Sequence, residues 1–114
     1  MNNQFSFYKE YPTDKRVETV VAMAVYAGDR IEWIKEAVES ILGQSYANFV
    51  FVIVVDGDVP NVFTQYLSDI ANKDDRVWLM FGAQNRGLST CMNAAIDATL
   101  ALKPKYFFRM DADD

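Results

Sequence analysis

The 114-residue sequence has no histidine and only one cysteine, Cys91. Because no imidazole is present, the chain cannot build a histidine metal site, a Ser-His-Asp triad or a Cys-His pair by itself. Any acid–base chemistry must use Asp, Glu, Lys or Tyr, or residues that this sequence does not contain. A single cysteine also rules out an intrachain disulfide, and nothing else in the sequence indicates an oxidising compartment.

Basic residues are scarce as well, since 11 Lys and Arg face 16 Asp and Glu and give a net charge of −5. Without a basic cluster to neutralise a row of phosphates, we expect no nucleic-acid partner. The longest strongly apolar run, residues 49–55, is too short to span a bilayer, and the polar N-terminus lacks a signal-peptide pattern. We therefore predict no membrane span and a cytoplasmic location, with the inner face of the membrane as the alternative for a full-length protein.

Strand-type and helix-type segments alternate along the chain, half of whose residues are hydrophobic. The predicted strands are 17–26, 49–55, 77–81 and 106–110, and the predicted helices are 30–43, 60–72 and 88–102. This alternation predicts a three-layer α/β/α domain over residues 17–114 with a mostly parallel sheet. The apolar runs, including the aromatic run at 106–110, are typical of buried strands. Residues 1–16 show no clear period and are predicted to be an N-terminal arm.

The helix patterns also predict caps and buried faces. Asp29 and Asp58 stand where N-cap residues are expected for the first two helices. In the third helix, apolar residues at helical spacing are expected to face the sheet. They are Leu88, Met92, Ala95, Ile96 and Leu100, and Cys91 is expected in the core as well.

Polar residues follow each of the four predicted strands, at 28–29, 56–58, 84–87 and 111–114. Ligands of parallel α/β sheets bind beyond the carboxyl ends of the strands. Because those ends meet at one edge of the sheet, the four polar loops predict a ligand site there.

The last four residues hold three carboxylates, Asp111, Asp113 and Asp114. In an extended backbone Asp111 and Asp113 lie on the same side, because side chains alternate with a period of two. Such hard oxygen ligands suit Mg²⁺ or Mn²⁺, which would take further ligands from substrate phosphates. The same residues could be a solvated charged terminus, and spacing alone leaves both interpretations open.

Asp56 and Arg86 are further candidates for ligand contacts. Asp56 directly follows an apolar strand and could hydrogen-bond a base or ribose, or could simply be the turn residue of an Asp-Gly pair. Arg86 precedes a helix whose first turn offers free N–H groups, so this segment could bind an anion. Alternatively, Asn85 and Gly87 shape the loop while Ser89 caps the helix.

Five segments, taken in order, resemble family 2 glycosyltransferases with the GT-A fold. They are VYAG at 25–28, AVESILGQSY at 37–46, VVDG at 54–57, NRGLSTCMN at 85–93 and RMDADD at 109–114. The last segment resembles one bacterial branch of the family, associated with cell-surface polysaccharide synthesis. The resemblance covers residues 19–114, in the family's order and spacing.

The resemblance implies a Rossmann-like nucleotide-diphospho-sugar transferase half that passes a sugar, with inversion, to an acceptor hydroxyl on a saccharide or lipid-linked acceptor. It implies that Tyr26 lines the base pocket, that Asp56 meets the base, and that Arg86 and Gly87 lie near the nucleotide. The implied cofactor is Mn or Mg, and the residues implied for the ribose and the metal are Asp111, Asp113 and Asp114.

The sequence also departs from the family pattern. Ala24 and Ala27 replace the usual Pro and Asn, and Val55 replaces the first Asp of V-D-D-G, so one expected nucleotide contact is missing. Met92 and Ala95 replace a frequent Arg and Gly. The family's general base lies on a later segment, so the catalytic base is expected beyond Asp114. We therefore expect an inactive N-terminal piece of a longer enzyme.

Two other classes of protein remain as alternatives. A non-catalytic nucleotide-binding or interaction module could keep this fold with part of the site lost, and Val55 favours that view. A phosphoryl-transfer domain of receiver or phosphatase type is the second. Such domains place their defining acids near the first strand, whereas here the D-x-D comes last.

Overall fold

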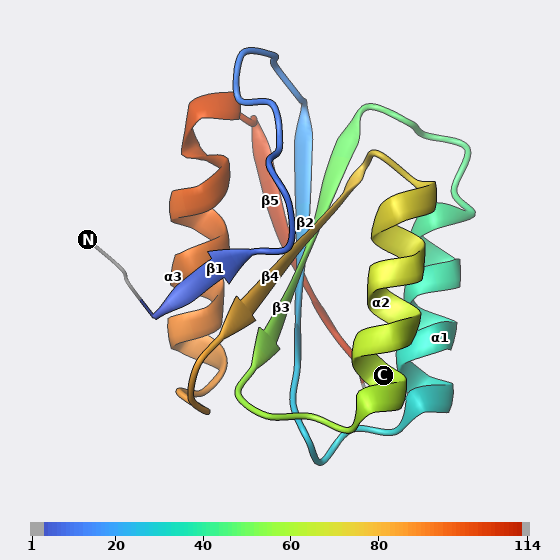
Figure 1. Cartoon of the computed structure of the whole chain (residues 1–114). Coiled ribbons are helices and arrows are strands. Elements are labelled where there is room, and N and C mark those ends of the chain that lie inside the picture. The colour runs from blue at the N-terminus through green and yellow to red at the C-terminus, as the bar shows by residue number, and fades with distance from the viewer. Residues whose placement is uncertain (1–3, 113–114) are drawn as a thin grey trace.

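A five-stranded sheet with helices on both faces forms the domain (Figure 1). The computed structural model describes residues 4–112, and its strand order is β1-β4-β3-β2-β5. Strands β2 to β5 are parallel and β1 is antiparallel to β4. The elements are β1 (Phe5–Phe7), β2 (Thr19–Val25), α1 (Ile31–Leu42), β3 (Phe49–Asp56), α2 (Asn61–Lys73), β4 (Val77–Gly82), α3 (Leu88–Thr99), the 3-10 helix η1 (Leu100–Leu102) and β5 (Tyr106–Asp111).

The centre of the sheet is β3, whose eight residues are all buried. It pairs with β2 on one side and β4 on the other, while α1 and α2 cover one face of the sheet and α3 the other (Figure 1). Each face has its own hydrophobic cluster, with Phe51 and Ile53 toward α1 and α2 and Val52 and Val54 toward α3. The predicted three-layer α/β/α fold with a mostly parallel sheet is confirmed. Within residues 4–112, no helix is long and apolar enough to cross a membrane.

The N-terminal arm contributes a strand that the sequence did not predict. Phe5 to Phe7 pair with Gly82 to Met80, which makes β1 the antiparallel edge of the sheet. Beyond this strand, the ring of Tyr11 stacks on Trp78 at 5.0 Å between centroids, and its hydroxyl accepts a hydrogen bond from the Leu79 amide at 3.0 Å. A strand of three residues is too short to show a period of two, so its aromatic content was the only available signal.

Strand β5 lies at the opposite edge, and the prediction that its aromatic run is buried was wrong. Tyr106 and Phe108 are 54% and 55% exposed and stack on each other at 6.3 Å. Among the described strands, β5 pairs with β2 alone. Apolar composition identified the strand correctly. It could not show that β5 is an edge strand whose aromatic side chains are left partly uncovered by the helices.

The buried face of α3 also differs from the predicted one. Ala95 is buried as expected, but Leu88 and Ile96 are exposed, as is Leu100 in η1, and Met92 is only partly buried. The residues that face the sheet are small ones: Cys91, Ala94, Ala95 and Thr99. Small side chains let the helix approach β2 and β3 closely, beside the bulky Trp78 and Met80 of β4. Volume complementarity therefore selected this face over the more hydrophobic stripe beside it.

The predicted caps are wrong for both α1 and α2. The N-cap positions belong to Arg30 and Pro60, and neither helix has a side-chain cap among the residues described. Asp29 Oδ2 instead accepts a hydrogen bond from the Tyr26 amide at 3.0 Å, which closes the turn after β2. Likewise, the N-cap of α3 is Gly87 and not Ser89.

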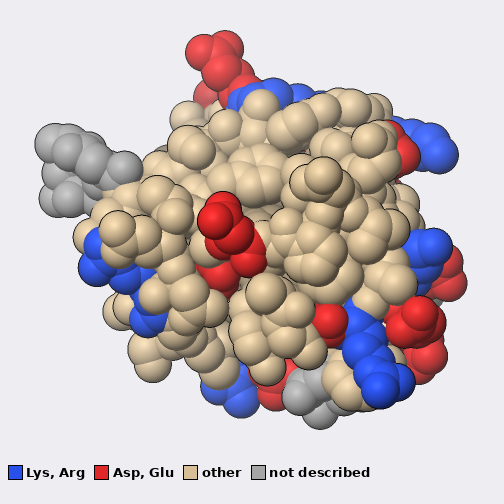
Figure 2. Space-filling model, turned by 60° about the horizontal axis from the view of Figure 1, so that its bottom comes forward, with Lys and Arg blue, Asp and Glu red and all other residues tan. Residues whose placement is uncertain are grey.

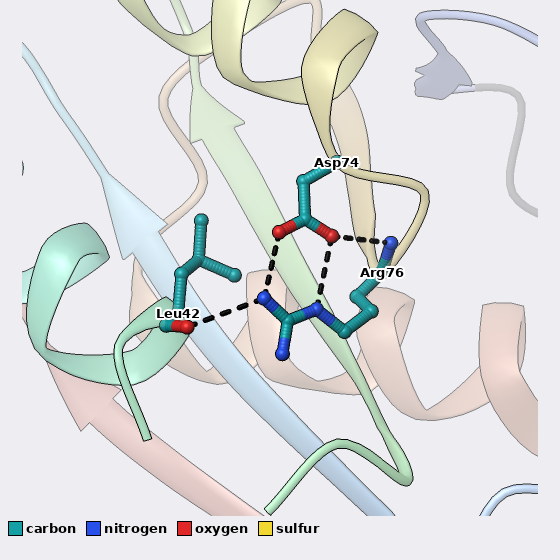
Figure 3. Close-up of polar contacts among 3 residues, drawn as sticks. All are labelled: Leu42, Asp74 and Arg76. Atoms are coloured by element: carbon teal, nitrogen blue, oxygen red, sulfur yellow. Dashed lines mark hydrogen bonds and ion pairs between the residues drawn. The ribbon is translucent and has the colours of Figure 1, made fainter. Parts of the chain in front are cut away.

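At the amino end of the sheet, Arg76 joins the turn after α2 to the end of α1 (Figure 3). Its guanidinium donates to Asp74 at 2.7 and 3.0 Å and to the Leu42 carbonyl oxygen at 3.2 Å. The side chain also lies over the Phe49 ring at 4.9 Å. The hydrogen bonds from Arg76 hold the pKa of the Asp74 carboxyl below its ordinary value.

We expect Arg76→Met to lower the free energy of unfolding by about 1–2 kcal/mol at pH 7, because charge-assisted hydrogen bonds are lost. Since the pKa of Asp74 is lowered on folding, its stabilising effect is present above the unfolded pKa of about 3.9 and is lost as pH falls through the folded pKa. Urea unfolding at pH 7 and at low pH measures both effects. Arg109→Met is the control, because Arg109 is half-exposed and its ion pair with Asp111 is 3.4 Å long. Equal losses for the two variants at pH 7 would contradict the prediction.

Candidate functional site

A cavity of about 440 Å³ opens at the carboxyl edge of the sheet. All four predicted polar loops contribute to its walls, so they meet at this edge as expected. Its lining residues are Ala24, Tyr26, Asp29, Asp56, Asn85, Gly87, Leu88, Asp111 and Ala112. Figure 2 looks onto this edge and shows acidic side chains in the middle of the face, among uncharged ones, with Lys and Arg mostly toward its margins.

The loop after β2 presents the ring of Tyr26 at one wall. This side chain is half-exposed, and its ring lies over Gly28, where an added Cβ would come within 2.6 Å of the ring atoms. The bond from the Tyr26 amide to Asp29 fixes the backbone of the same turn. A glycine at position 28 therefore leaves room for an aromatic ring that can stack on a planar ligand.

Asp56 ends β3 and lies beneath the loop of residues 84–87, which forms another wall of the cavity. Only 4% of the surface of Asp56 is exposed. Its two carboxylate oxygens accept hydrogen bonds from the backbone amides of Arg86, at 2.7 Å, and Gly87, at 2.9 Å. The neighbouring Gly57 has a φ of +82°, which only glycine adopts readily. The end of β3 thus supports the loop between β4 and α3.

The side chain of Arg86 does not line the cavity. With the Gln4 amide oriented so that its oxygen faces the guanidinium, Gln4 accepts from Arg86 Nη2 at 3.0 Å and Nη1 at 3.3 Å. The backbone of Gln4 also accepts a hydrogen bond from the Ala83 amide at 3.0 Å. Arg86 is therefore close to the site, but its charge is directed toward the N-terminal segment.

Asp111 is the one carboxylate of the acidic end that the described structure includes. It ends β5 beside Ala24 of β2, its side chain is about one-third exposed, and it lines the cavity. Asp113 and Asp114, also predicted as metal ligands, lie outside the described residues. Within residues 4–112, no three Asp, Glu or Cys side chains come together as a metal-binding cluster.

Cys91 is fully buried in α3, as predicted for a core residue. Burial raises the pKa of its thiol to about 12, with further contributions from the charge of Asp56 and from a hydrogen bond to it. The thiol is therefore protonated at neutral pH and is a donor to Asp56 and not a nucleophile.

Asp29, Asn85 and Ala112 belong to the predicted polar loops, whereas two further wall residues, Ala24 and Leu88, were not predicted. Ala24 follows Ala22 at a spacing of two on the α3 side of β2, so the strand pattern could have placed it beside Asp111. The contact between Gln4 and Arg86 had no signal in the sequence, because it joins residues about eighty positions apart through a strand that was not predicted.

A parallel α/β sheet with a ligand cavity at its carboxyl edge is the arrangement of nucleotide-binding α/β proteins. The chain belongs to glycosyl transferase family 2, whose family model matches residues 20–114. An uncharacterized glycosyltransferase of Haemophilus influenzae is 30% identical over 95 residues, and one of Methanocaldococcus jannaschii is 31% identical over 101 residues. These matches cover 83% and 89% of this chain but only 28% and 33% of the relatives.

A solved structure supports the fold. The mannosyltransferase PcManGT of Pyrobaculum calidifontis, in complex with GDP-Man and Mn²⁺, superposes with a TM-score of 0.68 at 16% identity. The match covers 95% of this chain and 31% of the mannosyltransferase. At this identity the likeness establishes the GT-A-type fold alone.

Proposed function

We propose that this chain is the donor-binding part of a glycosyltransferase that uses a nucleotide-diphospho-sugar. The observation that carries the proposal is the cavity at the carboxyl edge, walled by Tyr26, Asp111 and the loop that Asp56 supports, in a member of family 2. Its volume of about 440 Å³ falls within the range of small-molecule sites. The structural neighbour with GDP-Man supports the same ligand class.

Each predicted site residue has a role in this proposal. Tyr26 stacks on the base, and Asp56 and Gly87 form the wall beside the nucleoside. Arg86 contacts the diphosphate after its side chain turns away from Gln4, and Asp111 binds the ribose or the metal. A diphosphate is a strong enough anion to compete with a neutral amide for a guanidinium.

A divalent cation, Mn²⁺ or Mg²⁺, is part of the proposal. The donor atoms fit, because the described wall offers carboxylate oxygens and the chain has no histidine. We propose Asp111, Asp113 and Asp114 as the ligands. When bound, the cation would neutralise the charge of the departing nucleoside diphosphate. The chain's own residues would hold the donor and orient it.

For the whole protein, we propose sugar transfer with inversion to a saccharide or lipid-linked acceptor, in cell-surface polysaccharide synthesis. Since the chain spans a third or less of these relatives, we place the general base and most of the acceptor site beyond Asp114. The 114-residue chain is then expected to bind the donor without transferring its sugar. Sugar transfer by the purified chain would overturn that part of the proposal.

Calorimetric titration with uridine, guanosine and adenosine diphosphates, with and without Mn²⁺, tests the proposal. We expect Mn²⁺-dependent binding of at least one of them. Absence of binding across the panel would overturn the donor site in this chain. A non-catalytic nucleotide-binding module, supported by Val55 in place of an acidic residue, predicts the same binding but no sugar transfer by a longer form of the protein.

A further inference from the structure

We infer that Asp56 contributes to ligand binding as a positioning residue, by fixing the backbone of residues 84–87, and not by touching the base. For its effect on nucleotide affinity the inference depends on the proposed function. The geometry itself involves the chain's own residues and can be tested without a ligand.

The carboxylate of Asp56 is already engaged on both oxygens. Oδ1 accepts from the Arg86 amide at 2.7 Å, and Oδ2 accepts from the Gly87 amide at 2.9 Å. The Cys91 thiol adds a third donor from the first turn of α3. Because a carboxylate has about four acceptor positions and this one is almost fully buried, it has little left to offer a ligand.

The residue after Asp56 holds the same loop by a steric route. A Cβ at Gly57 would lie 2.7 Å from the Asn85 nitrogen and 3.1 Å from its Cα, so the loop rests directly on the glycine backbone. The Asn85 side-chain amide also reaches the Asp56 carbonyl oxygen at 3.5 Å. Two consecutive residues at the end of β3 therefore fix the loop, one by hydrogen bonds and one by lacking a side chain.

The other side of the loop faces the cavity. Asn85 and Gly87 line the cavity, and apart from Gly87 itself and its chain neighbours no atom of residues 4–112 lies within 4 Å of where a Cβ of Gly87 would be. Gly87 has a φ of +94° and is the N-cap of α3, a helix without a side-chain cap of its own within the described residues. Asp56 instead holds the two residues that lead into the helix, through the amides of Arg86 and of the N-cap Gly87. A loop fixed before binding loses less conformational freedom when a ligand arrives.

The experiment compares Asp56→Asn and Asp56→Ala with the unaltered chain, first without ligand. We expect the amides of Arg86 and Gly87 to be protected from hydrogen exchange in the unaltered chain. Protection should be partly lost in Asp56→Asn, which keeps one acceptor oxygen, and lost in Asp56→Ala. Unchanged exchange of both amides in Asp56→Ala would overturn the inference, whatever the ligand results.

The second measurement is the affinity for uridine, guanosine and adenosine diphosphates in the presence of Mn²⁺. Loss of a hydrogen bond to a charged acceptor predicts about tenfold weaker binding for Asp56→Asn. If Asp56 acts through the loop, every diphosphate that binds weakens by a similar factor and their order stays the same. Where two or more diphosphates bind, a loss confined to one base would mean direct recognition and would overturn the inference.

Two further variants separate positioning from general loss of stability. Val38→Ala removes methyl groups from the cluster under α1, on the other face of the sheet. It should lower the melting temperature but leave the loop amides and the affinities unchanged. Gly57→Ala keeps the Asp56 carboxylate but forces residues 84–85 away, so it should reproduce the loss of protection and of affinity. If Val38→Ala weakened nucleotide binding as much as Asp56→Asn, a positioning role would be contradicted.

Discussion

Replacement of Phe51 by alanine is expected to lower the free energy of unfolding by about 3–5 kcal/mol. Phe51 lies at the middle of β3, is fully buried, and faces the cluster between the sheet and helices α1 and α2. Its strand neighbours are Val21 on β2 and Val77 on β4. Because strands flank it on both sides, the backbone cannot move in to fill the space, and most of the side-chain volume becomes a cavity.

Such a loss is a large fraction of the roughly 5–15 kcal/mol that stabilises a typical domain. Urea unfolding followed by the fluorescence of Trp78, which is fully buried, measures it. Phe108→Ala on β5 is the matched control, since the chemistry is identical but the side chain is half-exposed. We expect it to cost at most about 1 kcal/mol. Comparable losses for the two variants would mean that β5 is as well covered as β3.

These two phenylalanines also show how far the sequence alone could predict the fold. Residues 49–55 and 106–110 are both apolar runs, and both were predicted as buried strands. The prediction succeeded for β3 because strands and helices surround it on every side. It failed for β5 because composition identifies a strand but not its neighbours, and the position at the edge follows from long-range pairing.

For the candidate site, too, some features could be predicted from the sequence and others could not. The meeting of the four polar loops was predictable, since parallel strands bring their carboxyl ends to one edge. The orientation of individual side chains was not. Asp56 points inward to the amides of residues 86 and 87, thirty positions away, and Arg86 points to Gln4. Contacts of this kind depend on the packing of separate segments, so a local pattern carries no signal for them.

The exposed stripe on α3 extends this argument to helices. The helix packs on the sheet through small residues such as Ala94 and Ala95. The exposed Leu88, Ile96 and Leu100 are more hydrophobic than these alanines, so the hydrophobic periodicity favoured the wrong face. The sheet surface under α3 already contains Trp78 and Met80. The space left beside such large residues admits a helix only through its small residues, and that constraint lies outside the helix sequence itself.

Asp111→Asn should have the largest effect on ligand binding. Asp111 is the one carboxylate of the acidic end placed in the described structure, and it faces the cavity from the end of β5. An amide keeps the shape of the side chain but removes the negative charge that attracts the cation, and it leaves only a neutral carbonyl oxygen as a ligand. We expect the affinity for a nucleoside diphosphate with Mn²⁺ to fall on the order of a hundredfold, because the loss of even an outer-shell partner costs a metal site about 10–100-fold.

The variant should fold normally, because the Asp111 ion pair with Arg109 is solvent-exposed and such pairs contribute roughly 0–1 kcal/mol. Asp75→Asn makes the same charge change in the exposed turn before β4, at the amino end of the sheet, and should leave the affinity unchanged. Titrations of both variants with and without Mn²⁺ separate the effect of losing the Asp111 carboxylate at the cavity from the effect of changing the net charge of the protein. If Asp111→Asn kept the full Mn²⁺ dependence, Asp111 would not be a metal ligand. If it lost affinity equally with and without Mn²⁺, the carboxylate would act on the nucleotide itself, as a ribose contact would.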